Sequence, residues 1–474
     1  MERLLLEERD KQFHREDDML GSILALVVTL CVGYMVFKNY KAQTVLIVAG
    51  CFLMAASVLL TGKPLLSAKA TTGLVWFDIF EFIKNTLSSR VAGLGLMIMS
   101  VAGFAKYMDH IGASRVLVNL MIKPLLMLRS PYLVLSGGYV FGQILALFIT
   151  SASGLGLLLM VTLYPVLIRL GVSRLSAVAV IGTTQSMDLG PGSGNSNLAA
   201  VNSGMDVATY FVNYQIPVGL CIMATVAILH FVVQKYLDRR DGLGGQAEAD
   251  PGIDTATQAQ DLPPKIYALL PILPLGLILG FSPLITKAIK MDVVTAMFIS
   301  TAISMVFEYL RSKDIRKTFA SLQVFFDGMG VQFAMVITLI VAGEVFANGL
   351  TSIGAIKSII DLGQSLGFGG AIMTIVMVAI ISVAAVIMGS GNAPLFAFAA
   401  LAPAIATKMS IAPVAMLLPM QFASSIARSV SPITAVIVAV SGVANVSPFE
   451  VVKRTAIPMA GAMLANIIAA AILI

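Results

Sequence analysis

Long apolar runs alternate with short polar segments along almost the entire chain. A helix needs about 20 residues to cross the hydrocarbon core of a bilayer, which is about 30 Å thick. Runs that approach this length are predicted to span the membrane at residues 20–37, 44–60, 91–107, 216–234, 266–284, 293–310 and 331–346. The pattern is typical of an all-α polytopic membrane protein.

Three shorter segments lie between these runs. Residues 75–87 carry three charged residues among aromatic ones, and residues 111–128 carry two widely spaced basic residues. Both segments are predicted to be amphipathic helices at the membrane interface. Residues 318–329 form a short segment of the second half, directly before the span at 331–346.

Two pairs of apolar arms are each joined by a small polar turn. The arms are predicted at 131–148, 155–170, 371–388 and 395–407, and the turns at 150–154 and 389–394. The arm at 395–407 would be a helix of only about 20 Å, which is too short to span the core. Each pair is therefore predicted to be a re-entrant hairpin with its tip at the midplane. For the first pair, two ordinary spanning helices remain an alternative.

Two further apolar runs are interrupted by polar residues. The run that begins near residue 175 becomes TTQSMDLGPGSGNSN at 183–197, and the later run contains QFASSIARSVSPIT at 421–434. Pro432 removes a backbone donor there, and broken backbone is tolerated at this depth where it is buried in protein or lines water. Both runs are predicted to be helices with unwound centres, at 183–197 and 424–434. The alternative for the first is an exposed loop between two helices.

The order of these elements is the same in the two halves of the chain, which predicts two inverted repeats. Each repeat is expected to contain five transmembrane helices, a re-entrant hairpin and an unwound helix. An odd number of crossings in the first repeat inverts the second. The predicted segments are a polar N-terminal tail at 1–19, repeats at 20–235 and 264–474, and a cytoplasmic linker at 236–263.

Composition supports the membrane class, because 58% of the 474 residues are hydrophobic and only 12% are charged. The net charge of +6 does not indicate a nucleic-acid partner, since the basic residues gather in short loops. Cys31, Cys51 and Cys221 lie in apolar runs and are expected to be free thiols. The three histidines are scattered, so neither a metal site nor a cofactor is expected.

Charge also predicts the orientation, because short loops rich in Lys and Arg stay in the cytoplasm. With the N-terminus outside, the basic segments near Lys38, Lys106, Arg174, Lys235 and Arg454 all lie on the cytoplasmic side. Both termini are therefore predicted to be periplasmic. The tail lacks the pattern of a cleaved signal peptide, so the first run is expected to be a retained helix.

Arg428 lies near the middle of an apolar run. An arginine at this depth costs about 2.5–3.5 kcal/mol on insertion scales, so it usually faces a cavity and has a partner. Ser425, Ser429 and Ser431 lie beside it. A fixed cation among freed polar groups predicts a binding site for a small anion. The alternative is an arginine that snorkels or holds two helices together.

The other candidate binding residues are small or polar residues of the turns and breaks, namely Ser151, Ser153, Gly154, Thr183, Thr184, Asn195, Ser390, Gly391 and Asn392. The alternative for the serines of the turns is that small residues simply let two backbones approach closely. Asp188 and Glu344 are candidate partners for a coupled proton or Na⁺. For Glu344, a structural carboxylate paired within the bundle is the favoured interpretation.

Four motifs carry a resemblance to a known family: ITSASGLGLLLMVTLYP (149–165), MGSGNAPLFAF (388–398), ARSVSPITAVIVAVSG (427–442) and SPFEVVKRTAIPM (447–459). They resemble the DcuC-type anaerobic four-carbon-dicarboxylate carriers of bacteria, and the DcuD branch most closely. The resemblance extends from about Leu20 over nearly the whole chain. The segment DLGPGSGNSN, which contains Asp188, departs from the family pattern.

The resemblance implies the ion-transporter superfamily, a homodimer, elevator-type movement, and exchange, efflux or uptake of succinate, fumarate and malate across the bacterial inner membrane. A dianion in a cavity of low dielectric needs cationic compensation. Arg428 offers a planar fork for one carboxylate, and serines of the two turns are placed to hold the other end.

We therefore expect a secondary carrier rather than an enzyme. A carrier of another small organic anion is the alternative. A channel would need a continuous polar pore, which paired hairpins that end at the midplane would not form. An intramembrane enzyme would need a catalytic motif, and the sequence contains no HExxH pattern, nucleophile–histidine pairing or cofactor loop.

Overall fold

The computed structural model describes residues 20–243 and 262–474, without residues 37, 39, 63, 128, 129, 287 and 290 and most of 356–368. Its described part consists of helices and connecting segments, with no β-strand. Seven of these helices are long and apolar enough to cross a membrane. The predictions for the tail at 1–19 and for most of the linker at 236–263 lie outside the described residues.

The first half contains the helix Leu20–Val36, α2 (Ala42–Thr61), α3 (Val75–Arg90), η1 (Val91–Gly95), α4 (Leu96–His110), α5 (Ala113–Ile122), η2 (Lys123–Met127), α6 (Pro131–Ala146), α7 (Ala152–Thr162), α8 (Tyr164–Arg169), α9 (Arg174–Thr183), α10 (Gly194–Asn202), α11 (Val207–Tyr210), η3 (Phe211–Gln215) and α12 (Ile216–Arg240). The second half contains η5 (Lys265–Ile272), α13 (Leu273–Gly280), α14 (Val293–Ser312), α15 (Ile315–Gln332), η6 (Phe333–Ile337), α16 (Thr338–Ser352), α18 (Gly370–Met388), α19 (Asn392–Phe398), α20 (Ala402–Lys408), α21 (Pro413–Arg428), α22 (Ala435–Ala444) and α23 (Pro448–Leu473).

Two helices are much longer than the hydropathy pattern predicted. The prediction of a separate interfacial helix at 75–87 is wrong, because α3, η1 and α4 form one helix of 36 residues. The segments predicted at 318–329 and 331–346 likewise belong to one helix of 38 residues, formed by α15, η6 and α16. Polar side chains interrupt the hydropathy but leave the backbone hydrogen bonds intact. A π-helical turn within each long helix, η1 and η6, keeps the helix continuous.

Other predicted boundaries also move. The span predicted at 266–284 is a 3₁₀-helix followed by α13, and it ends at Gly280. Pro271 and Pro274 remove backbone donors there, which disfavours a regular α-helix. The segment predicted at 111–128 is α5 followed by η2, and α5 packs closely against η5. The two turns between the arms overlap the predicted segments at 150–154 and 389–394 but cover 147–151 and 389–391, because α7 begins at Ala152 and α19 at Asn392. The second arms are divided into α7–α8 and α19–α20.

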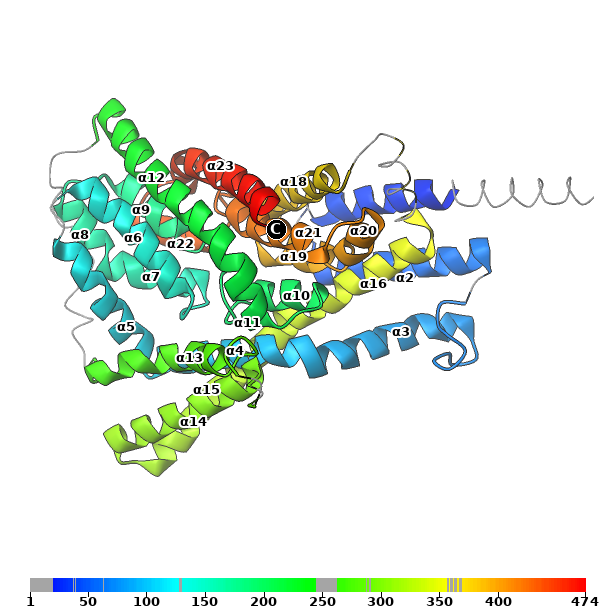
Figure 1. Ribbon diagram of the computed structural model, residues 1–474, viewed down its shortest axis with the longest axis horizontal. Coiled ribbons are helices and arrows are strands. Elements are labelled where there is room, and N and C mark those ends of the chain that lie inside the picture. Colours follow the sequence, from blue (N-terminus) through cyan, green and yellow to red (C-terminus); the bar gives the residue numbers. More distant parts are fainter. Residues whose placement is uncertain are drawn as a thin grey trace, which may run out of the picture.

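The helices pack into two groups. We call α2–α4 with α13–α16 the long-helix bundle, in which α2 packs on α16 and α4 on α15. We call α6–α12 with α18–α23 the core bundle, in which α12 packs on α23 and α18 on α21. In Figure 1, α12 and α23 lie side by side in the upper part of the view, and α2, α3 and α16 extend to the right.

The long-helix bundle is held together by close backbone contacts. Where α4 crosses α15, a Cβ atom added at Gly328 would lie only 2.8 Å from the Cα of Gly103. Without a hydrophobic driving force inside lipid, such close contacts between small residues are a main source of helix association.

We expect Gly328→Ala to lower the melting temperature of the purified protein in detergent. The added methyl group would force α4 and α15 apart, and overpacking typically costs about 1–3 kcal/mol. Gly330→Ala is the matched control, because a Cβ atom there meets open space. Alanine favours a helix over glycine by about 1 kcal/mol, so this control should melt no earlier than the parent. Equal melting temperatures for both variants would contradict the close crossing.

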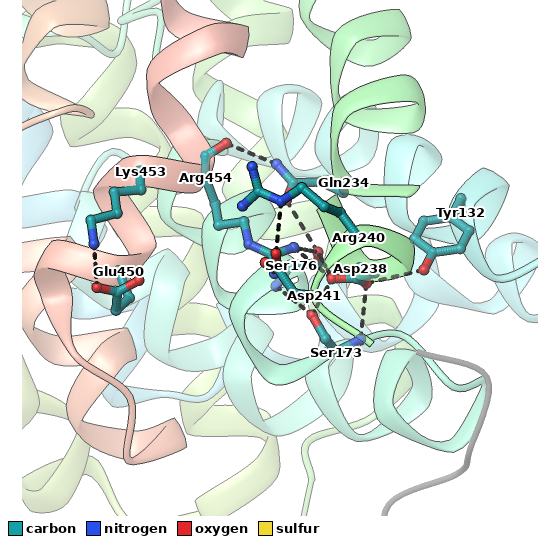
Figure 2. Close-up of polar contacts among 10 residues, drawn as sticks. All are labelled: Tyr132, Ser173, Ser176, Gln234, Asp238, Arg240, Asp241, Glu450, Lys453 and Arg454. Carbon is teal, nitrogen blue, oxygen red and sulfur yellow. Dashed lines mark hydrogen bonds and ion pairs between the residues drawn. The ribbon is translucent and has the colours of Figure 1, made fainter. Parts of the chain in front are cut away.

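A buried ion pair joins helices of the core bundle at one end (Figure 2). Arg454 of α23 donates from Nη1 to Oδ1 of Asp238 in α12 at 2.5 Å, and both side chains are almost fully buried. Asp238 also accepts hydrogen bonds from Tyr132, Ser173 and Ser176. The start of α6, the start of α9 and the end of α12 therefore meet at one carboxylate.

Arg454 was predicted to be a loop charge, and that prediction is wrong because only 3% of the residue is exposed. Its Nη2 atom donates to Asp241, the residue that follows α12, at 2.8 Å. A hydrogen bond from Arg240 holds the pKa of Asp241 below its ordinary value. Arg454 consequently has two carboxylate partners within the protein, Asp238 and Asp241.

Candidate functional site

A cavity of about 530 Å³ lies between the two bundles. One wall comes from α4, α15 and η6 of the long-helix bundle. The other comes from the turn between α6 and α7, the segment between α9 and α10, and α19 and α21. The cavity lining includes the predicted site residues Ser151, Ser153, Asn195, Asn392 and Arg428.

The turn between α6 and α7 and the break between α9 and α10 each lead into a capped helix. The hydroxyl of Ser151 accepts a hydrogen bond from the N–H of Gly154 at the start of α7, and Ser193 caps α10 in the same way. Capping fixes the first turn of a helix, whose free N–H groups and positive dipole end favour anions. Both helices begin at the cavity, so its polar wall is partly backbone.

The second turn is shaped by Gly389, which ends α18 in a left-handed conformation with φ of 62°. The hydroxyl of Ser390 accepts from the N–H of Ala393 at the start of α19. The carbonyl of Gly391 accepts from the hydroxyl of Ser424, which ties the turn to α21. A Cβ atom at Gly391 would meet the Arg428 side chain at 2.9 Å, so glycine makes room for the arginine.

Arg428 is the last residue of α21 and is 9% exposed. Its Nη2 atom donates to the carbonyl of Gln185 at 2.8 Å and lies 3.2 Å from Oδ1 of Asp188. The break in this helix begins at Ser429 rather than at Ser424, because helical hydrogen bonds continue up to the arginine. Ser424 and Ser425 are therefore helical residues.

Arg428 is paired with Asp188, a contact that the sequence analysis did not predict. Its carboxylate also accepts from Nδ2 of Asn195 at 2.6 Å and from the hydroxyl of Ser425 at 2.7 Å. The two charged residues come from the two polar interruptions of the chain. One interruption carries a negative charge and the other a positive charge, and this was the sequence signal available for the pairing.

Two buried glutamines hold the unwound backbone beside this ion pair. Gln421 donates to the carbonyl of Asp188 at 2.7 Å, and its own carbonyl accepts from Tyr210 and from Gln215. Gln215 in turn accepts from the N–H of Gly190 at 3.0 Å. Backbone groups freed by the break are thus paired inside the protein, as the apolar surroundings require. A glutamine in an otherwise apolar helix was the signal for this role.

Some predicted site residues do not line the cavity. The hydroxyl of Thr183 contacts Nε2 of His230 at 2.9 Å, and that of Thr184 donates to the carbonyl of Ile181. The hydroxyl of Ser429 donates to the carbonyl of Ser425 at 3.2 Å. Ser431 is buried, and its hydroxyl has no hydrogen-bond partner within the described part of the chain.

Glu344 is paired inside the protein, as the favoured interpretation predicted. Nε of Arg90, at the end of α3, lies 2.5 Å from its carboxylate on α16. The pair lines a separate pocket of about 380 Å³ with Asn348 and Thr351, not the cavity of Arg428.

Seven apolar helices, two interrupted helices that meet at an ion pair, and a polar cavity beside them define a multi-pass membrane transport protein. More specifically, the chain belongs to the DcuC family of C4-dicarboxylate anaerobic carriers, whose sequence pattern matches residues 20–474. The family and its curated members are transporters, not enzymes.

Individual relatives agree with this assignment. The chain is 37% identical over 452 residues to the "Anaerobic C4-dicarboxylate transporter DcuC" of Escherichia coli K12, with 95% of this chain and 96% of the relative covered. It is 36% identical over 457 residues to the "Probable anaerobic C4-dicarboxylate transporter DcuC" of Vibrio cholerae, with 96% and 98% covered. Among solved structures, the YdaH transporter of Alcanivorax borkumensis has a similar fold. Its TM-score is 0.57 at 15% identity, with 91% of this chain and 98% of that chain covered.

Proposed function

We propose that the protein is a secondary active transporter of C4-dicarboxylates such as succinate, fumarate and malate in the bacterial inner membrane. The observation that carries this proposal is Arg428, a nearly buried cation in the wall of a polar cavity. The names of the relatives support the substrate class.

Arg428 has hydrogen-bonding capacity to spare for a substrate carboxylate. Among the described residues, its hydrogen bonds all run from Nη2, to Gln185 and Asp188. The N–H groups on Nε and Nη1 remain, and a planar two-point contact pairs Nη2 with one of them, so a substrate carboxylate would take the place of Asp188 on Nη2. Ser151, Ser153 and Asn392, together with the start of α7, offer neutral donors around it.

Asp188 links binding to a coupled cation. Asp188 compensates the charge of Arg428, with Oδ1 at 3.2 Å from Nη2. A substrate carboxylate that engages Arg428 brings further negative charge to the same place, and buried carboxylates close together do not all stay ionised. We therefore place the coupling proton or Na⁺ at Asp188, where Asn195 and Ser425 already bind the carboxylate.

The depth of the first turn supports a re-entrant hairpin. The starts of α6 and α9 meet at Asp238, so both helices enter from the same side. From there α9 runs only 10 residues, about 15 Å or half of the hydrocarbon core, before it ends. Gln185, which follows α9, donates to the carbonyl of Ile149 in the turn at 2.7 Å. The turn therefore lies near mid-depth.

The wider architecture follows from these hairpins. We propose two inverted repeats, at 20–235 and 264–474, with the core bundle moving past the long-helix bundle as an elevator within a homodimer. The end of α12 and the start of α23 lie together at Asp238 and Arg454, as antiparallel neighbours in inverted repeats would. We place this end in the cytoplasm and both chain termini outside, in accord with the positive-inside rule.

Counterflow in proteoliposomes tests the proposal. Vesicles that contain the purified protein and internal unlabelled succinate should take up labelled succinate faster than protein-containing vesicles without internal succinate. A carrier that binds internal succinate returns its site to the outer face with substrate bound, which speeds the exchange. A channel would show no such trans-stimulation. If another small organic anion stimulates uptake while succinate, fumarate and malate do not, the substrate class is wrong although the carrier remains.

A further inference from the structure

Lys106 is a second cation at the cavity, and nothing in the ion pair described above involves it. It lies on α4 and lines the cavity from the wall of the long-helix bundle, whereas Arg428 belongs to the core bundle. Its side chain is exposed, and within the described parts of the chain it forms no ion pair. The predicted span at 91–107 contains Lys106 close to its end, and α4 continues three residues further, to His110.

The neighbouring carboxylate does not neutralise Lys106. Asp109 lines the same cavity three residues further along α4, and no ion pair joins it to Lys106 within the described residues. A charged residue that a membrane helix turns toward a cavity is by default a candidate functional residue. The cavity therefore offers an anion two positive groups on different walls, one a planar fork and the other a flexible point charge.

We propose that Lys106 binds the substrate carboxylate that Arg428 does not, and so selects dianions over monoanions. This inference rests on the proposed function and adds a specificity residue to it. One guanidinium engages one carboxylate, and the second carboxylate of a four-carbon diacid needs its own compensation in a cavity of low dielectric. A monocarboxylate leaves Lys106 without a partner.

The placement of Lys106 makes the two faces of the carrier unequal. Ile111-Gly112-Ala113 after α4 matches Ile353-Gly354-Ala355 after α16, which aligns Lys106 with Asn348. Asn348 lines the separate pocket beside α16, where the charge of Arg90 is already compensated by Glu344. A second cation is thus available to bind the substrate only in the state of the carrier in which α4 forms the wall of the cavity.

The test compares both faces of the carrier. Half-saturation for succinate is measured in right-side-out and inside-out vesicles with Lys106→Gln and with the control Lys123→Gln. Lys123, on η2, is equally exposed but does not line the cavity. Lys106→Gln should raise half-saturation about threefold to tenfold on one face only, as expected for a partly screened charge. The control should match the parent on both faces.

Four further measurements make the outcome decisive. Monomethyl succinate should compete better against succinate in Lys106→Gln than in the parent, and the loss should shrink at high ionic strength. Lys106→Arg should fold and keep the dianion preference, and Asn348→Lys should lower half-saturation on the opposite face.

Values for Lys106→Gln that equal the parent's on both faces, or that change equally on both, would overturn the proposal. Failure of the proposed function can be distinguished from failure of this inference, because the parent protein itself would then show no succinate counterflow.

Discussion

Arg428→Lys should fold like the parent protein but bind succinate roughly ten- to a hundredfold more weakly. Lysine keeps the charge and loses the planar fork, and a hydrogen bond to a charged group contributes about 1.5–3 kcal/mol. Lysine would also be expected to lose the contact with Gln185, which now orients the side chain at 2.8 Å. The measurement is a titration with succinate, after elution volume and melting temperature have been compared with the parent.

Asp188→Asn is the matched control from the other side of the ion pair. Asparagine keeps the shape of Asp188 but no longer competes for Arg428, so succinate should bind at least as tightly. Dependence of transport on the coupled cation should be lost, because the carboxylate that accepts it is gone.

A well-folded Arg428→Lys with unchanged succinate affinity would contradict the role of Arg428 in binding the substrate carboxylate. The binding site would then have to lie at the two turns. Loss of folded Arg428→Lys, with normal binding by the remainder, would mark a structural arginine.

The second large effect is expected at the buried pair of Figure 2. Asp238→Asn should destabilise the protein by about 3–5 kcal/mol, because it leaves the Arg454 charge partly unpaired in the interior. Of its two carboxylate partners Arg454 would retain Asp241, which lies outside the helix and is partly exposed. The pair joins the end of α12 to the start of α23, so its loss should loosen the two halves of the core bundle. Thermal melting in detergent measures the change.

Figure 2 also contains the control for this prediction. Lys453 and Glu450 form an ion pair on the outer face of the same helix, with side chains 70% and 49% exposed. Glu450→Gln should therefore change stability by less than about 1 kcal/mol. Adding Arg454→Gln to Asp238→Asn should recover part of the loss, because no unpaired charge then remains. Equal melting of Asp238→Asn and Glu450→Gln would refute the assignment of a buried pair.

The membrane class, most helix positions and the two polar interruptions could be read from the sequence. Hydropathy is a local property, and a helix must be apolar where it meets lipid, so the runs near α2, α14 and α18 were predictable. The break predicted at 183–197 was predictable for the same reason, because a polar stretch with Gly and Pro interrupts an apolar helix. It is shorter than predicted, since α9 ends at Thr183 and α10 begins at Gly194. The cavity position of Arg428 also followed from the cost of its charge in lipid.

Helix continuity was not predictable from hydropathy. Residues 75–87 and 318–329 looked like separate segments because their side chains are polar, yet backbone hydrogen bonding is indifferent to that polarity. Hydropathy likewise did not show that Lys106, close to the end of the predicted span at 91–107, lines the cavity.

What the sequence determined by itself was which segments lie in the membrane and where they break. What only the tertiary structure decided was which polar residues meet there. Asp188 and Arg428 lie 240 residues apart in sequence, and nothing local in either segment specifies the other. Their contact exists because α9 and α21 both end at the same depth beside one cavity. Asp238 and Arg454 are paired for the same kind of reason, since the packing of α12 on α23 removes both charges from water.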